Sequence, residues 1–125
     1  MPPTQVHEIS PFIEGLPKAE LHIHLEGSVR PETLLTLARK AGSPLGSRTR
    51  TELTDFYPFR DFPHFVETYV TVCDCLSDGA DFALITEELG AEAARQNIRY
   101  LEATFTPIRH VVTRGIPFDE VMDGL

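Results

Sequence analysis

Leu16-Pro-Lys-Ala-Glu-Leu-His-Ile-His-Leu-Glu-Gly-Ser28 is the stretch that decides the fold. Apolar and polar residues alternate through its second half, and this period of two predicts a β-strand whose two faces meet different surroundings. His22 and His24 share one parity, so we expect both imidazoles on the same face, with Cβ atoms about 6–7 Å apart. At that separation two ring nitrogens can bind one metal ion. We expect Gly27 to end the strand, because glycine lets the backbone turn freely.

The composition is that of an ordinary globular domain, with 125 residues of which 42% are hydrophobic and 24% are charged. No apolar run reaches the roughly 18 residues of a membrane span, and the start Met1-Pro-Pro lacks the features of a signal peptide. We therefore expect a cytoplasmic protein without membrane contact. The formal charge of −8, with scattered Lys and Arg, argues against nucleic acid and favours a small-molecule partner. Cys73 and Cys75 would lie on different faces of a helix, which predicts reduced thiols.

Capping residues and apolar spacing predict four helices before the next strand. We expect the first over residues 6–15, and the second from near Pro31, with Ser28 as its N-cap, to a stop at Gly42. The third would run from Phe62, with Asp61 as its N-cap, to about Leu76. The fourth would run from Ser77 or Asp78 to residues 96–97. Residues 43–55 are polar and show no periodicity, which predicts an irregular connection.

A second alternating stretch, residues 98–105, predicts another strand, and Glu102 and Thr104 lie on its polar parity. Residues 108–115 would form a loop and a helix would begin at Pro117. This order is the start of a repeating β/α plan, and a complete (β/α)8 barrel takes roughly 250 residues. We therefore expect an α/β fold in which residues 1–125 are the N-terminal segment of a single (β/α)8 TIM barrel domain, with its first two strands and their helices and with the remainder absent.

Residues 16–33 resemble the N-terminal signature of the adenosine deaminase family, within the metal-dependent amidohydrolase superfamily. Residues 95–107 resemble the second strand of that family, and residues 114–118 resemble the start of its next helix. The resemblance implies a barrel that holds one zinc ion, with a water on the metal attacking C6 of a 6-aminopurine and ammonia leaving. It also implies that His22 and His24 are the first two zinc ligands and that Glu26 binds a ribose or other substrate hydroxyl.

The aromatic run of residues 56–65 resembles the family's lid over the substrate pocket. Phe59, Phe62 and Phe65 are therefore candidates for an apolar wall that excludes water, although a stripe at spacing three is also typical of a buried helix face. His110 is expected to be an ordinary loop histidine. The family's third zinc histidine, its His-Ala-Gly-Glu segment and its late zinc-binding Asp have no counterpart in the chain. We therefore expect no catalytic residue within residues 1–125 and no activity from this chain alone.

Two departures from the family pattern leave the substrate open. Adenosine-specific members commonly have Asp at the position of Glu26, and the family commonly has Arg at the position of Thr104. Adenine deaminase and aminodeoxyfutalosine deaminase are therefore alternatives to adenosine deaminase, and a different His-x-His metal hydrolase is another. A further alternative is a non-catalytic binding module whose exposed strand edges would need a partner. That partner would be a second copy of the chain, in a homo-oligomer, or the missing remainder of the barrel.

Overall fold

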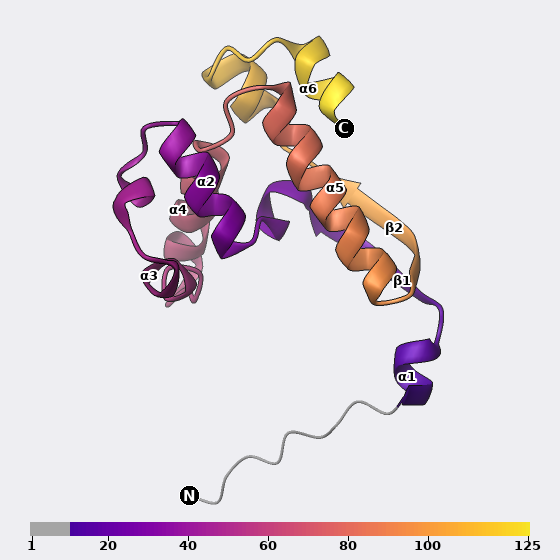
Figure 1. Ribbon diagram of the computed structural model, residues 1–125. Coiled ribbons are helices and arrows are strands. Elements are labelled where there is room, and N and C mark those ends of the chain that lie inside the picture. The colour runs from indigo at the N-terminus through magenta and orange to yellow at the C-terminus, as the bar shows by residue number, and fades with distance from the viewer. Residues whose placement is uncertain (1–10) are drawn as a thin grey trace, which may run out of the picture.

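Two parallel strands, β1 (Lys18–His24) and β2 (Ile98–Thr104), form the sheet in the computed structural model, which describes residues 11–125. In Figure 1, helix α5 lies along this sheet, and α2, α3 and α4 gather together to one side of it. The helices of the described chain are α1 (Pro11–Gly15), α2 (Pro31–Lys40), α3 (Arg50–Thr54), α4 (Phe62–Cys73), α5 (Gly79–Arg95) and α6 (Phe118–Gly124). The predicted α/β order of strand, helices, strand and helix is confirmed.

The capping signals place most helix ends correctly. Asp61 accepts a hydrogen bond from the backbone N–H of His64 at the start of α4, and Asp78 does the same for Asp81 at the start of α5. Gly42 follows α2 with a positive φ of 67°, the conformation expected of a glycine that ends a helix. The predicted first helix is present from Pro11, and its earlier part lies outside the described residues.

Strand β1 is present as predicted, but the predicted alternation of two faces does not hold at its centre. Glu20 pairs with Leu101 and Ile23 with Ala103, so three steps along β1 match two along β2. The extra residue makes a bulge in which His22 has a φ of 62°, an unusual value for a residue other than glycine. Bulges redirect side chains and occur often beside functional sites, so the bulge, and not a regular pleat, sets the direction of His22.

The end of β1 also differs from the prediction. The strand stops at His24, and a 3-10 helix, η1 (Leu25–Ser28), follows it. Gly27 therefore lies inside η1 and does not end the strand. Ser28 does not cap α2, because its hydroxyl donates to the carbonyl of Leu25 and the N-cap position of α2 is Arg30.

Two segments that lacked periodicity are helical in the structure. Residues 43–55 contain the 3-10 helix η2 (Pro44–Ser47) and α3, which Thr49 and Glu52 stabilise through a reciprocal capping box. Residues 108–115 contain a π-helical turn, η3 (Ile108–Thr113), in place of the expected loop. Leu45 of η2 and Leu53 of α3 anchor the first segment to the interior, and His110 of η3 anchors the second.

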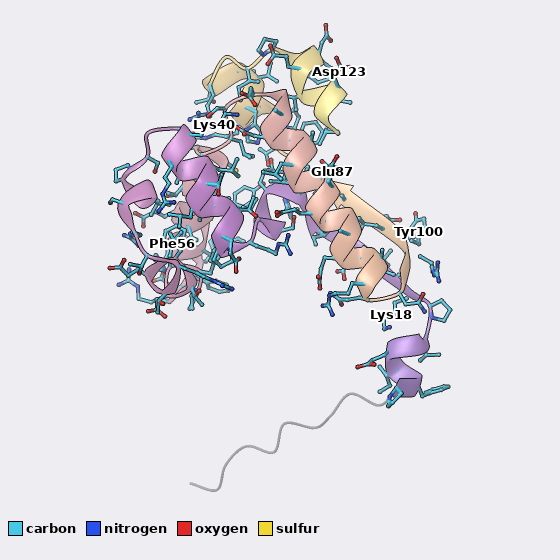
Figure 2. All side chains as sticks on the ribbon, in the orientation of Figure 1. Lys18, Lys40, Phe56, Glu87, Tyr100 and Asp123 are labelled. Atoms are coloured by element: carbon cyan, nitrogen blue, oxygen red, sulfur yellow. The ribbon has the colours of Figure 1, made fainter. Side chains whose placement is uncertain are left out.

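The core lies between α5, α2 and the carboxyl end of the sheet. It contains Phe82 and Ile85 from α5 and Leu34 and Leu37 from α2, each at most 1% exposed. Cys73 and Cys75 are buried free thiols, as predicted. Lys18, labelled in Figure 2, lies at the start of β1, where its Nζ donates to the carbonyls of Glu14, Leu16 and Gln96. Among residues 11–125, no helix combines the length and the apolar character that crossing a membrane requires.

Helices α5 and α6 approach closely at Gly79. Alanine at Gly79 and alanine at Gly90 are therefore expected to have opposite effects on stability. A Cβ at Gly79 would lie far inside contact distance of the Glu120 backbone carbonyl, whereas a Cβ at Gly90 of the same helix meets open space. Gly79→Ala is therefore expected to destabilise the fold by about 1–3 kcal/mol, and Gly90→Ala to stabilise it by about 0.5–1 kcal/mol. Urea unfolding of both variants measures the difference, and equal shifts of the two midpoints would contradict the close approach.

Candidate metal centre

His22 and His24 lie together at the carboxyl end of β1. Their ring centroids are 5.3 Å apart, with the ring planes 80° to one another. Both residues are exposed, and both line the same pocket of about 310 Å³. Glu20, Ile23 and Gly27 line it too, and Phe65 and Tyr69 of α4 complete it. The structure thus brings the two predicted ligands to one solvent-accessible pocket.

The donor set of this pair suits zinc. Two imidazole nitrogens are ligands that zinc commonly takes, and a catalytic zinc site uses three protein ligands with one position open. Within residues 11–125, His22 and His24 belong to no group of three ligating side chains that lie within mutual reach. A zinc site built on this pair would therefore need at least one further ligand from outside the described residues.

Glu26 does not continue the row of the two histidines. Because the strand ends at His24, η1 carries Glu26 into the interior, where it is 0% exposed. Its Oε1 accepts hydrogen bonds from the backbone N–H of Thr106 at 2.7 Å and from Nε2 of His110 at 2.8 Å. Its Oε2 accepts one from the hydroxyl of Tyr69 at 3.0 Å. Both carboxylate oxygens are thus occupied by protein donors.

These donors determine the charge of Glu26. Burial alone would raise the pKa of its carboxyl, but the hydrogen bonds from His110, Thr106 and Tyr69 outweigh burial and hold the pKa below its usual value. An ionised carboxylate can only accept hydrogen bonds, so Nε2 of His110 carries the proton that it donates. The carboxylate therefore lies buried as an anion that three segments of the chain hold.

His110 is a functional candidate that the sequence prediction misses. The expected loop histidine is 0% exposed, and its ring packs edge-on against Phe82 with centroids 4.8 Å apart. Its Nδ1 is buried and has no hydrogen-bond partner among the described residues. The π-helical turn η3 places it there, and a loop prediction could not indicate that burial.

A second group of ligand-type side chains comprises Glu26, Cys73 and His110, all buried, with one donor atom of each within 4.8 Å of the others. Burial, followed by the nearby charge of Glu26, raises the pKa of the Cys73 thiol to about 12, so its sulfur is protonated at neutral pH. Metal binding requires the thiolate, and the carboxylate already accepts three hydrogen bonds. In this structure the group is a hydrogen-bonded part of the core.

Of the three predicted aromatic residues, only Phe65 lines the pocket. Phe59 and Phe62 pack against it, with ring centroids 5.2 and 6.1 Å away, and are 60% and 74% exposed. The face that α4 buries consists instead of Thr68, Val72 and Cys73. The alternative of a buried helix face is therefore wrong for these phenylalanines among the described residues.

Tyr69 is a second residue that the sequence prediction misses. It lies four residues after Phe65 and so on the same face of α4, a spacing that could have indicated it. Its ring meets that of His24 edge-on, with centroids 5.8 Å apart, and its hydroxyl binds both Glu26 and Thr106. Thr104, which replaces the arginine of the family pattern, is exposed and pairs with His24 in the register of the sheet.

Comparisons with known proteins identify the family and the fold of the chain. The profile of the family described as adenosine deaminase matches residues 17–125. The chain is 37% identical to an aminodeoxyfutalosine deaminase of Streptomyces coelicolor over 98% of its own length and 32% of that protein. It superposes on the crystal structure of an adenine deaminase from Arthrobacter aurescens with a TM-score of 0.77 and 31% identity, covering 86% of this chain and 33% of that one.

An amidohydrolase from Burkholderia ambifaria, solved with bound Zn, also superposes with a TM-score of 0.77, at 29% identity over 96% of this chain and 34% of that one. The chain thus spans about a third of the length of the relatives that it matches. The expected fold class, an α/β fold that corresponds to the first two strands and their helices of a (β/α)8 barrel, is confirmed.

Proposed function

This chain belongs to the adenosine deaminase family, and from that premise we propose that residues 1–125 form the N-terminal segment of a single barrel domain of a zinc-dependent hydrolytic deaminase. The substrate class is a 6-aminopurine nucleoside or base, and the products include ammonia. The observation that carries the proposal is the placement of His22 and His24 on one open pocket at the carboxyl end of β1. In β/α barrels this end of the strands bears the chemistry.

The described residues have separate roles in this proposal. His22 and His24 would hold the zinc, which when bound supplies a water that is acidic near neutral pH. Phe65, supported by Phe59 and Phe62, forms an apolar wall that keeps bulk water from a flat purine. Contact of Glu26 with a substrate hydroxyl stays a prediction, and it requires this carboxylate, which is 0% exposed, to become accessible.

Named relatives support the substrate class at the level of small aminopurines. One similar protein is named as a deaminase of aminodeoxyfutalosine, another as a deaminase of adenine. Both molecules carry an amino group on a purine ring, so the same apolar wall and the same pair of histidines would suit either substrate. We propose the cytoplasm as the compartment and a free small molecule, not nucleic acid, as the partner, in keeping with the net charge of −8.

The test is ammonia release by the product of the complete reading frame that carries this chain, with adenine, adenosine and aminodeoxyfutalosine as substrates. We expect turnover of at least one of them, with zinc copurifying. The 125-residue chain alone is expected to release no ammonia, because its described residues supply two zinc ligands where a catalytic site uses three. Absence of turnover by the zinc-loaded complete product on all three purines would contradict the proposal. Turnover by the 125-residue chain alone would contradict the proposal that the remaining ligands lie outside it.

A further inference from the structure

Glu26 joins four segments of the chain beside the metal-binding histidines. It lies in η1, two residues after His24, and its hydrogen-bond donors come from α4, from the residue Thr106 after β2, and from η3. Glu26 and His110 are both 0% exposed. A buried carboxylate with three donors resists movement, because any displacement leaves polar groups without partners in the interior.

Tyr69 connects this carboxylate to the ring of His24. Its hydroxyl is fixed at two points, to Oε2 of Glu26 at 3.0 Å and to Oγ1 of Thr106 at 2.8 Å. The ring of His24 is nearly perpendicular to the rings of both Tyr69 and His22, at centroid distances of 5.8 and 5.3 Å. The ring of His24 thus packs against a tyrosine whose hydroxyl is held by two hydrogen bonds.

We propose that Glu26, Tyr69 and His110 are positioning residues, which fix the backbone directly after His24 and the ring beside it so that both imidazoles stay directed at one point. This inference rests on the proposed function only in taking His22 and His24 as metal ligands. It gives Glu26 a task that differs from the predicted contact with a substrate hydroxyl. The carboxylate acts through the protein and need not touch substrate.

The decisive variant is Tyr69→Phe, which removes the fixed hydroxyl and keeps the ring. Side-chain NMR of the metal-free complete product, labelled at histidine, is expected to show shifted and broadened His24 resonances. Zinc titrations of the same protein are expected to show an affinity lower by about tenfold or more, the usual effect of removing an outer partner of a metal ligand. Glu26→Gln, which keeps the shape of the side chain, is expected to act in the same direction.

Tyr57→Phe is the matched control. The Tyr57 hydroxyl donates to the carbonyl of Val29 at 2.6 Å and is also partly buried, but among the described residues its ring pairs with that of Phe56 and not with His24. This variant loses a comparable hydrogen bond and some stability, yet it should leave the His24 resonances and the zinc affinity unchanged. A purely structural role of Tyr69 would make the two variants alike.

His24 resonances that superpose on those of the unaltered chain in both Tyr69→Phe and Glu26→Gln would overturn the inference. So would equal changes in Tyr57→Phe. The NMR comparison needs no metal and no substrate, so it decides the inference even if the complete product deaminates no purine. Conversely, unchanged His24 signals would leave the deaminase proposal standing and remove only the positioning role.

Discussion

Glu26→Ala is expected to lower the free energy of unfolding by about 3–5 kcal/mol, because each buried donor that it leaves without an acceptor costs about 1–3 kcal/mol. The substitution leaves the Thr106 N–H, the Tyr69 hydroxyl and Nε2 of His110 without their acceptor in a region that water does not reach. It also opens a small cavity beneath η1. Urea unfolding followed by circular dichroism measures the loss.

Two comparisons sharpen this result. Glu26→Gln keeps the volume and one acceptor oxygen, so it should recover part of the lost stability. Glu102→Ala removes an exposed carboxylate on the neighbouring strand, one whose hydrogen-bond donor among residues 11–125 is Tyr100, and its unfolding midpoint should not move. A midpoint for Glu26→Ala equal to that of Glu102→Ala would mean that the buried hydrogen bonds do not hold the fold.

His24→Ala is expected to weaken zinc binding by the complete product at least about 100-fold. Four-ligand zinc sites bind with about 10–16 kcal/mol, so one ligand carries roughly 3 kcal/mol, and each 1.4 kcal/mol is tenfold. Deaminase turnover should fall in parallel, because the remaining ligands hold the metal too weakly and in the wrong position. Metal analysis after dialysis and ammonia release measure both effects on the same sample.

His64→Ala is the control for this variant. His64 lies on the same helix as Phe65 and Tyr69, but its Nδ1 accepts the backbone N–H of Arg60 and it lines a different pocket. The His64→Ala variant should keep the zinc content and the turnover of the unaltered protein. Full zinc content and rate in His24→Ala would show that the pair does not bind the metal, whereas equal losses in both variants would indicate general damage to the fold.

The elements that the sequence predicts well have their signals within a few residues. Asp61 with Pro63, Asp78 and Gly42 each mark a helix end through local backbone chemistry. Alternation marks both strands, although it cannot indicate the bulge at His22, because a bulge depends on the register against β2. The two histidines thus lie close together as expected, but the bulge that sets the direction of His22 is visible only in the pairing of the strands.

The surroundings of Glu26 could not be predicted from any local pattern. Its three donors lie 43, 80 and 84 residues further along the chain, and nothing in a parity or capping rule connects such distant positions. Two other features do have local signals in the sequence. Thr49 and Glu52 have the spacing of a capping box, and Tyr69 has the helical spacing that places it beside Phe65.

The same long separations affect the order in which the chain can fold during translation. At typical rates His110 is synthesised roughly 4–17 s after Glu26, from which it is 84 residues away. Until then the carboxylate lacks one of its three donors, and burying it would be unfavourable. Helices α2 to α5 precede His110 in the chain, and α2 contacts its sequence neighbours η2 and α3. The turn that follows the histidine-bearing strand therefore becomes fixed late, after these helices have left the ribosome.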